Sequence, residues 1–467
     1  MQHRGNMPAE RIDDNQTADS LLIYNEGLAH LLGAFANETR LRILSTLLRR
    51  RQEFADLQGC VGISKTALAK HLNVLVSAGA IQRVGRGTYQ ITNDAADSLR
   101  SICQTYLWSR ERRLSDAVRR VKLYSLASKE ERQEMKKYEV KKKAEILPTW
   151  ISYVGATTGV LNSLGIDVDR ADVAGYTGYA FVVNVSKEGT CPSGPTAHDA
   201  FFEFPRGFEA LGWKVDFSHK QVEGCGFEAG KVLTDGQKEL ALDHYKEVSK
   251  NLRLTERPVV IWGAPIPEFS IVNGVDDGKY IVSSFRSHVG QPDDPLNYDQ
   301  LQAPGGVMLI SFKEQVKKPD VAKADFEALD RAIDIAKGKY VEDFGYVMGP
   351  NAFEVWAKNL TTKDALYGGN AYVGVCTQEA FAWAEMFLSR MAKRYKGKAQ
   401  SKFLDAAAKS FDKAQKIMDD FTKLFPFSWE REFQNGDRES GAKMLLETRH
   451  YFEQAISNME KAHTEWD

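Results

Sequence analysis

The chain contains 467 residues, more than one ordinary hydrophobic core holds, so we expect two or three domains. Its 62 Lys and Arg residues nearly balance its 63 Asp and Glu residues, which excludes a protein that is basic or acidic over its whole surface. The sequence has no run of about eighteen apolar residues and no apolar segment near its start, so we expect neither a membrane span nor a signal peptide.

The first part of the chain is predicted to be an arm followed by three helices. Residues 1–18 are polar and lack periodicity, so we expect a disordered arm there. Leucines recur at helical spacing over Asp19–Phe35, which predicts a helix longer than a small domain needs for its own core. Asn37–Arg49 is expected to form a capped amphipathic helix, and Phe54–Gly59 a short helix after a polar turn.

A further helix, with one polar face, is predicted over Ile63–Gly79. Ser64 suits its N-cap, and Leu68, Leu72 and Leu75 recur at the spacing of a buried stripe. The opposite face mixes cations, short donors and a small residue, which suits the DNA major groove, although any solvated helix can have this composition. The predicted DNA-contacting residues of this helix are Ser64, Lys65, Thr66, Ala69, Lys70 and Asn73.

A hairpin with a basic tip is predicted next. From Ala80 to Thr92 apolar and polar residues alternate around a Gly-Arg-Gly turn. Arg83 and Arg86 of this hairpin are expected to contact the DNA backbone or the minor groove. Residues 40–100 contain ten Lys or Arg and four Asp or Glu, which is the sign expected of a surface that binds phosphate.

This order of elements resembles the ArsR-type winged helix-turn-helix of prokaryotic repressors. Three segments carry the resemblance: Asn-Glu-Thr-Arg-Leu-Arg-Ile-Leu at 37–44, Ile-Ser-Lys-Thr-Ala-Leu-Ala-Lys-His-Leu at 63–72, and Leu-Val-Ser-Ala-Gly-Ala-Ile at 75–81. The resemblance implies a winged helix-turn-helix domain over 19–100 that binds double-stranded DNA as a homodimer, with the first and last helices of the domain pairing across a two-fold axis. The alternative is that these helices pack only within their own chain.

Residues 101–147 are predicted to be a charged helical connector. Neither Gly nor Pro occurs between 94 and 147, which favours a nearly continuous helical lever over a flexible tether. The Lys and Arg residues alternate with Glu, as on a solvated helix face, although they are also placed to reach phosphates beside the preceding domain. The candidate inward positions of the helix that starts near Asp94 are Leu99, Ile102, Tyr106, Leu107 and Leu114.

From residue 148 the chain becomes rich in glycine and aromatic residues, and 148–320 is predicted to be an α+β domain. A helix is expected over Ser152–Gly165, a buried strand over Gly178–Val185, and another helix from Pro205. An early helix followed by antiparallel strands is an α+β layout. The later strands are expected at Arg257–Trp262, Glu268–Val275, Lys279–Ser284 and Gly306–Phe312.

Residues 321–467 are predicted to be mostly helical. Apolar residues have helical spacing over Phe381–Tyr395, Ala399–Leu424 and Glu439–Ala462, and Tyr367–Gly374 is expected to be a glycine-rich turn. We expect these helices to form a bundle that packs against the α+β domain.

Patches of the sequence from about 150 to 460 resemble the papain-like domain of the butirosin-biosynthesis-H N-terminal family, which is distantly similar to double-glycine-leader peptidases. The segments are Pro-Val-Val-Ile-Trp at 258–262, Pro-Glu-Phe-Ser-Ile-Val-Asn-Gly-Val-Asp-Asp at 267–277, Cys-Pro-Ser-Gly-Pro-Thr-Ala at 191–197, Gly-Asn-Ala-Tyr at 369–372 and Leu-Phe-Pro-Phe at 424–427. Together the two resemblances imply a multidomain protein with an α+β winged helix-turn-helix head, a papain-like α+β domain and a C-terminal helical bundle.

The resemblance also shows which catalytic groups the chain lacks. Papain-like enzymes use a cysteine at the start of a helix, a histidine on a facing strand and a polar side chain that orients the histidine. These positions fall on Val154, on Glu268 and near Ser283 or Ser284. Valine cannot attack a carbonyl carbon, so we predict a papain-like domain without catalysis.

The cysteines leave one enzymatic alternative. A displaced pair of Cys191 and His198 would make the protein a cysteine-dependent amide hydrolase or acyltransferase. Metal binding by these two residues with Cys225 matches no common spacing, and Cys60 lacks the paired cysteine of metal-sensing ArsR proteins, so no metal or cofactor is predicted. The five cysteines form no C-x-x-C pair, which favours a reducing cytoplasm over a disulfide framework; they are Cys60, Cys103, Cys191, Cys225 and Cys376.

A cavity without a catalyst suits a small-molecule sensor. A carboxylate and aromatic walls suit a cationic or amine-bearing ligand, although aromatic residues of this kind are as often core. Together the two resemblances imply a dimeric DNA-binding transcriptional regulator of the ArsR type, either a repressor or an activator, in which a pseudoenzyme domain senses an unidentified ligand. The candidate ligand-binding residues are Tyr176, Tyr179, Cys191, Trp262 and Glu268.

Overall fold

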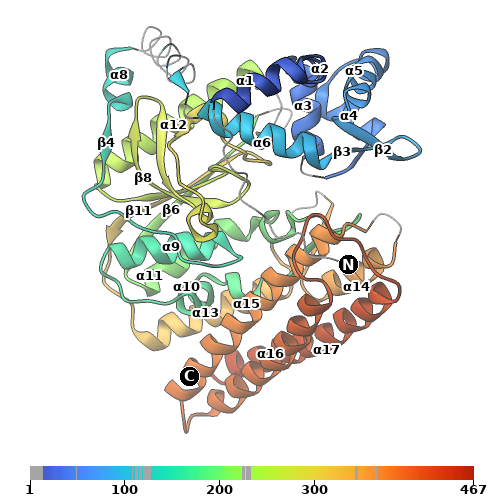
Figure 1. Cartoon of the computed structure of the whole chain (residues 1–467). Coiled ribbons are helices and arrows are strands. Elements are labelled where there is room, and N and C mark those ends of the chain that lie inside the picture. Colours follow the sequence, from blue (N-terminus) through green and yellow to red (C-terminus); the bar gives the residue numbers. More distant parts are fainter. Residues whose placement is uncertain are drawn as a thin grey trace. The chain divides into compact units, whose positions relative to one another are not determined.

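The computed structural model describes residues 14–48, 50–107, 109, 110, 114, 118, 128–222, 227, 233–341, 345–362 and 365–466. Helices and antiparallel sheets make up the chain, which divides near residue 119 into an N-terminal and a C-terminal compact unit (Figure 1). Each unit buries its own hydrophobic core. In the part of the chain that the structure describes, no helix is both long and apolar enough to cross a membrane.

The N-terminal unit combines helices with a small antiparallel sheet. In this sheet β3 lies between β1 and β2. Its described elements are α1 (Asp14–Ile23), α2 (Asn25–Phe35), α3 (Glu38–Leu47), β1 (Gln52–Glu53), α4 (Phe54–Val61), α5 (Lys65–Ser77), β2 (Ile81–Gly85), β3 (Thr88–Ile91) and α6 (Asn93–Leu107).

The core of the N-terminal unit is built from the predicted apolar stripes. Leu68, Leu72 and Leu75 of α5 are fully buried, and they belong to one cluster with Leu44 of α3 and Leu57 of α4. Helical spacing brings these leucines to one side of each helix, and burial of each leucine contributes about 1.5–3 kcal/mol. The capped helix, the short helix, the polar-faced helix and the hairpin therefore lie where the sequence predicted them.

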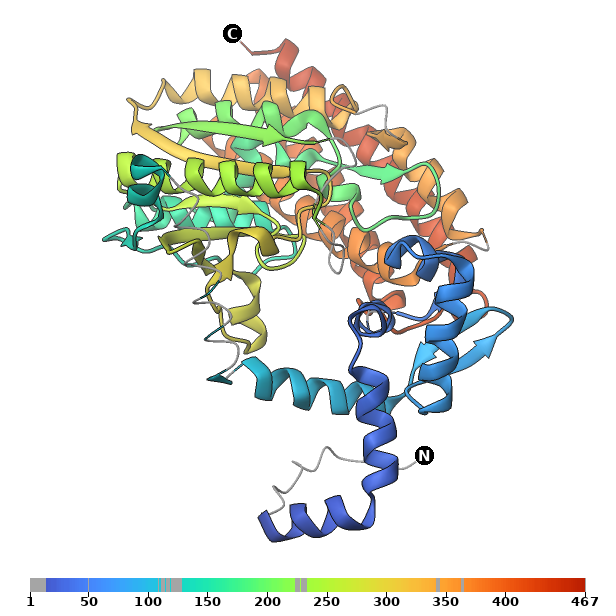
Figure 2. The same cartoon turned by 90° about the horizontal axis from the view of Figure 1, so that it is seen from above.

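Two predictions for the N-terminal segment were wrong. Residues 14–18, expected in a disordered arm, belong to α1; the remainder of the arm, 1–13, lies outside the described residues. The helix expected over Asp19–Phe35 is two helices, because the chain turns at Tyr24, and α1 and α2 (dark blue) run in different directions in Figure 2. The turn leaves Leu21 and Leu22 exposed.

The inward positions expected after the hairpin also need correction. Leu99 of α6 is buried, but Ile102, Tyr106 and Leu114 are exposed, and the side chain of Leu107 lies outside the described residues. Among the described side chains of α6, those in the core of the unit are Ala95 and Leu99, both in its first half. Ile102 and Tyr106 are therefore not covered by the described residues of the unit.

The C-terminal unit is organised around one antiparallel sheet. Its strands follow the order β10-β9-β8-β7-β11-β6, β4 pairs with β8 beside this path, and β12 pairs with β5 in a separate two-stranded sheet. The strands are β4 (Tyr138–Glu139), β5 (Asn184–Ser186), β6 (Trp213–Lys220), β7 (Val259–Trp262), β8 (Phe269–Asp276), β9 (Lys279–Ser283), β10 (Leu296–Asn297), β11 (Val307–Gln315) and β12 (Tyr346–Met348).

Helices cover both faces of this sheet. Figure 1 shows α12 on one face and α9 and α11 on the other, and three long helices, α15, α16 and α17, packed side by side. The helices of the unit are α8 (Lys129–Met135), α9 (Ser152–Ser163), α10 (Arg170–Thr177), α11 (Phe204–Ala210), α12 (Asp235–Thr255), α13 (Val321–Ala336), α14 (Pro350–Leu360), α15 (Tyr367–Arg394), α16 (Ala399–Leu424) and α17 (Asp437–Thr464).

The predicted connector is helical only in part. Most of 108–127 lies outside the described residues, and α8 ends at Met135. Residues 136–147, expected to be helical, instead form β4 and an extended segment, since the Asn273 side chain bonds both the N–H and the carbonyl of Ala144. This end of the connector therefore belongs to the C-terminal unit.

Two further local predictions were wrong. The stretch Gly178–Val185, expected to be one buried strand, forms a short 3-10 helix at Tyr179–Phe181 before β5 begins at Asn184. The glycine-rich stretch Tyr367–Gly374 is the first part of α15, not a turn. Its glycines allow close packing: a Cβ on Gly369 would lie 1.8 Å from the Thr190 carbonyl oxygen.

The α+β part and the C-terminal helices share one continuous hydrophobic core. Side chains of α15 reach the segment before α9, where the Glu379 carboxylate accepts hydrogen bonds from the Thr149 hydroxyl at 2.7 Å and from the Trp150 N–H at 2.8 Å. The chain from 128 onwards is therefore one structural unit, without the division at residue 320 that the sequence suggested.

Candidate functional site

The polar face of α5 is held by a cap at one end and by the core beneath it. The Ser64 hydroxyl accepts a hydrogen bond from the Ala67 N–H at 3.2 Å, as an N-cap side chain does. A left-handed Gly62 separates α4 from this cap. The outward side of α5 is thus fixed by the same leucines that anchor the helix.

The structure brings the predicted α5 residues together on this outward side. Lys65, Thr66 and Lys70 are exposed, as are Ser64 and Asn73, while Ala69 is half-buried. Among the described residues, no carboxylate lies within 4 Å of the Lys65 or Lys70 ammonium group. Two cations that have no acidic partner in the described chain therefore remain available to an anionic surface.

The β2–β3 hairpin supplies two more cations. Arg86 and Gly87 form its turn, and Gly87 has a φ of 83°, a conformation that glycine adopts without strain. Arg86 is exposed at this tip, and the Arg83 guanidinium lies 5.5 Å from the centre of the Tyr89 ring. The aromatic face orients Arg83 without neutralising it.

A second candidate site lies at the start of α9, where the papain-like resemblance placed a missing nucleophile. The position facing the strand is Ser152 rather than Val154, because α9 begins at Ser152 and Val154 is fully buried. The Ser152 hydroxyl donates a short hydrogen bond to Glu268 and accepts one from the Phe269 N–H at 2.9 Å. The side chain of α9 that contacts Glu268 is therefore that of Ser152, two residues before Val154.

Glu268 accepts a second hydroxyl hydrogen bond, at 2.6 Å, from Tyr372 of α15. Burial raises the pKa of the Glu268 carboxyl to about 7, although the two hydroxyl donors oppose that rise. Sequence reasoning missed Ser152 and Tyr372, since Tyr372 lies more than a hundred residues from Glu268 and was assigned to a turn. The positions expected to orient a catalytic histidine bond elsewhere: Ser283 accepts from the Ile146 N–H, and Ser284 donates to Asp293.

The chemistry available to this cluster is limited. Ser152 and Glu268 form a nucleophile and a carboxylate base in contact, but the Ser152 hydroxyl already makes two hydrogen bonds within the protein. The nearby cavity, which Ile151 and Tyr179 help to line, has a volume of about 10 Å³. This volume suits one water molecule, and neither Ser152 nor Glu268 lines the cavity.

The five candidate ligand-binding residues are not gathered around one open cavity. Tyr179 and Trp262 are buried, and each donates to a backbone carbonyl, that of Pro195 at 2.7 Å and that of Pro304 at 3.1 Å respectively. Tyr176 donates instead to the buried Asp325 at 2.9 Å. Of these five residues, only Tyr179 lines the small cavity of about 10 Å³. The aromatic residues therefore serve the core.

Cys191 and His198 each contact other groups among the described residues. The Cys191 thiol lies 2.8 Å from the Ser193 hydroxyl, whereas the His198 ring contacts the Pro195 carbonyl oxygen at 2.9 Å and stacks on Phe201. Burial lowers the pKa of His198 to about 4, which makes it a weak base at neutral pH. Cys225 lies outside the described residues, in which no group of three or more His, Cys, Asp or Glu side chains is arranged to hold a metal ion.

Comparisons with protein-family models and with curated proteins gave no match. Function is therefore argued from the two sites themselves.

Proposed function

We propose that the protein is a DNA-binding transcriptional regulator of the ArsR type. The observation that carries the proposal is the exposed face of α5, where Lys65 and Lys70 have no carboxylate partner in the described chain. Arg86, at the tip of the hairpin, is exposed as well. A helix with such a face enters a major groove, and the hairpin then reaches the adjacent backbone.

The order of the elements supports the same proposal. The N-terminal unit has a helix, a short strand, two helices and a hairpin whose second strand pairs with the short strand. This is the order of elements expected of a winged helix-turn-helix. The short strand β1 positions α4 because the Phe54 N–H donates to the Gly87 carbonyl oxygen at 2.9 Å. This hydrogen bond links the hairpin to the start of α4.

A homodimer is part of the proposal. Leu22, Ile23 and Tyr24 at the end of α1 expose 75%, 68% and 64% of their surfaces, and Ile102 and Tyr106 of α6 are also exposed. Exposed apolar residues on the first and last helices of the unit mark an interaction surface. A second copy that covers them would place two α5 helices on successive half-sites of double-stranded DNA.

The C-terminal unit is proposed to be a sensor without enzymatic activity, in a cytoplasmic protein. The four described cysteines are free, as expected in a reducing compartment. The Ser152 hydroxyl is already bonded to Glu268 and to the Phe269 N–H, and the Cys191 thiol contacts the Ser193 hydroxyl rather than a histidine among the described residues. These observations weigh against the alternative, a cysteine-dependent amide hydrolase or acyltransferase.

A gel shift with DNA from the region upstream of the protein's own gene tests the proposal at fixed salt. Replacing Lys65, Lys70 and Arg86 by alanine should weaken binding by about tenfold to a hundredfold, since one good base contact contributes about 1–3 kcal/mol. The matched control removes three exposed lysines of α16, Lys402, Lys409 and Lys416, and should bind as the wild type does. Equal binding by all three proteins would refute the proposal.

A further inference from the structure

The free edge of the main sheet carries a groove that no site described above uses. It has a volume of about 380 Å³ and runs along β6, the last strand in the sheet order. Asp216 and Ser218 line it from β6, and Ser311 and Lys313 from β11. On the far side it is bounded by α12, through Glu247.

The groove has a polar floor. Asp216 is paired directly with Ser311 across the two strands, and Ser218 lies two residues further along on the same face. Ser311 is only 3% exposed, yet its hydroxyl makes no hydrogen bond within the described chain, and neither does that of Ser218. Both hydroxyls therefore keep their hydrogen-bonding capacity for a ligand or a water molecule in the groove.

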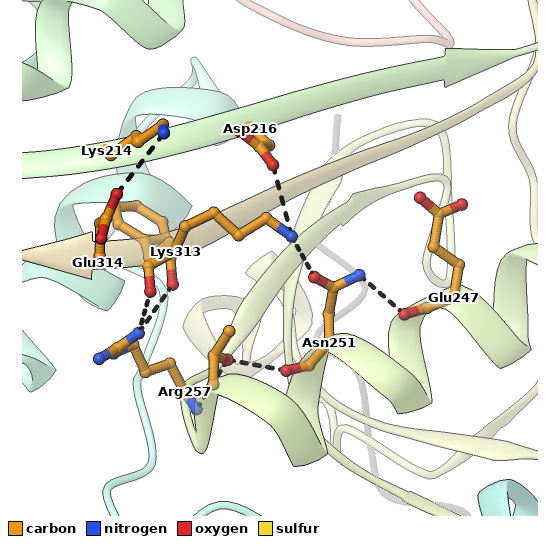
Figure 3. A network of polar contacts seen from close by, with 9 residues as sticks. Lys214, Asp216, Glu247, Asn251, Arg257, Lys313 and Glu314 are labelled. Atoms are coloured by element: carbon orange, nitrogen blue, oxygen red, sulfur yellow. Dashed lines mark hydrogen bonds and ion pairs between the residues drawn. The ribbon is translucent and has the colours of Figure 1, made fainter.

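The charged groups at the groove differ in the hydrogen bonds and ion pairs that they already make. Figure 3 shows the Lys313 ammonium held between the Asn251 side-chain oxygen and the Asp216 carboxylate, 3.6 Å away. Glu247 is already paired with Lys220 at 2.6 Å. Asp216 keeps most of its acceptor capacity, because its carboxylate is 58% exposed and receives no hydrogen bond in the described residues.

We propose that this groove binds a small ligand through a primary ammonium group. An ammonium group has three N–H donors, and the groove offers three acceptors on one face: the Asp216 carboxylate and the Ser218 and Ser311 hydroxyls. An anionic ligand is disfavoured, since the Lys313 ammonium already binds the Asn251 side-chain oxygen, whereas the Asp216 carboxylate accepts no hydrogen bond in the described residues.

The rim of the groove indicates the rest of the ligand. Phe202 is 55% exposed and packs edge-on against Phe217, with ring centres 5.2 Å apart, and both residues line the groove. Exposed aromatic rings favour an apolar or aromatic flank next to the ammonium group. The ligand class is therefore a small amine with an apolar body.

The helix that borders the groove also holds the start of the C-terminal unit. Lys246, the neighbour of Glu247 on α12, forms an ion pair with Glu131 of α8, and this interaction lowers the pKa of Glu131 to about 2. One turn further along, Ser249 and Arg253 donate to backbone carbonyls of residues 134 and 136. A ligand that shifts α12 would act on the connector; this effector role rests on the proposed regulatory function, whereas the ligand site does not.

Calorimetric titration of the full chain with 2-phenylethylamine tests the site, with 3-phenylpropionate as the charge-reversed control ligand. We expect the amine to bind and the carboxylate to fail. Asp216→Asn and Ser311→Ala should each weaken amine binding at least tenfold. Glu314→Gln removes a carboxylate from the same strand pair outside the groove, where it faces Lys214 at 3.5 Å, and should bind as the wild type does.

Three results would overturn the proposal: no amine binding by the wild type at millimolar concentration, equal binding of the carboxylate, or wild-type affinity in both groove variants. DNA affinity measured on the same samples without the amine separates the two claims. If the chain binds the amine and not DNA, the ligand site is supported and the regulatory role is refuted. If it binds only DNA, the regulatory role is supported and the ligand site is refuted.

Discussion

The Ser152 hydroxyl donates a hydrogen bond to the Glu268 carboxylate across the junction between α9 and β8. Glu268 is thereby held in a largely apolar interior where burial raises its pKa to about 7, against an ordinary value near 4.5. In the unfolded chain the carboxyl loses its proton at lower pH than in the folded chain. The protonated Glu268 carboxyl therefore makes its full contribution to the free energy of unfolding below about pH 4.5. This contribution is lost as the pH rises to about 7.

Glu268→Gln should remove this pH dependence. The amide oxygen still accepts hydrogen bonds, and glutamine has no proton to lose in this range. The free energy of unfolding is measured for both proteins by urea denaturation at pH 5 and pH 8. From pH 5 to pH 8 the wild type should lose up to about 3 kcal/mol of stability relative to the variant. A constant difference would mean that the carboxyl titrates normally.

Gly369 should be intolerant of a side chain. Its hypothetical Cβ would lie 1.8 Å from the Thr190 carbonyl oxygen, and backbone cannot move aside cheaply. Gly369→Ala should lower stability by about 1–3 kcal/mol or more. Gly236→Ala is the control, because it lies in the first turn of α12 with nothing within 4 Å, and should be neutral or stabilising by up to about 1 kcal/mol. Thermal melting of both variants compares them directly.

These residues illustrate what the sequence was able to predict. The caps at Asn37 and Ser64 and the leucine spacing of α5 are local signals, and both predicted helices exist there. Glu268 and Tyr372 lie 104 residues apart in the chain, and tertiary packing brings them into contact. No periodicity in the sequence indicates such a contact. The glycines at the start of α15 were interpreted as a turn. In a sequence, a glycine that allows the chain to turn looks the same as one that allows another segment to pack closely against a helix.

The groove was missed for a similar reason. Its acceptors come from β6 and β11, strands that are neighbours in the sheet but lie about ninety residues apart in the chain. Only the register that pairs Asp216 with Ser311 brings them onto one face. β6 itself carried no clear strand signal, since its second half is polar. Conversely, the predicted aromatic walls at Tyr179 and Trp262 are core because their polar atoms are satisfied by backbone carbonyls.

Thiol labelling should separate the cysteines by their environment. Cys60 and Cys103 are exposed, whereas Cys376 is buried and burial raises its pKa. Iodoacetamide should modify Cys376 only after unfolding, and Cys191 no faster than Cys60. Mass spectrometry of timed samples gives the rates. Rapid labelling of Cys191 at neutral pH, with a hydrolytic activity that Cys191→Ala abolishes, would favour the enzymatic alternative.

The exposed apolar residues of the N-terminal unit should hold a dimer together. Leu22→Glu combined with Tyr106→Glu places charges on the surface proposed to be covered, and should convert a dimer into a monomer in sedimentation experiments. Leu446→Glu changes an apolar residue that is 49% exposed on α17 and should leave the dimer intact. A wild-type monomer at micromolar concentration would exclude the symmetric arrangement.

Hydroxyl-radical footprinting of the full chain on its own upstream DNA tests the central claim most directly. A dimeric reading head should protect two half-sites about one helical turn apart, and Arg86→Ala should lose the protection that flanks each half-site while the central contacts of α5 remain. Lys65→Ala with Lys70→Ala should abolish the central protection. A footprint of this form is the predicted result; uniform cleavage, or a wild-type footprint in the variants without Lys65, Lys70 or Arg86, would contradict the account.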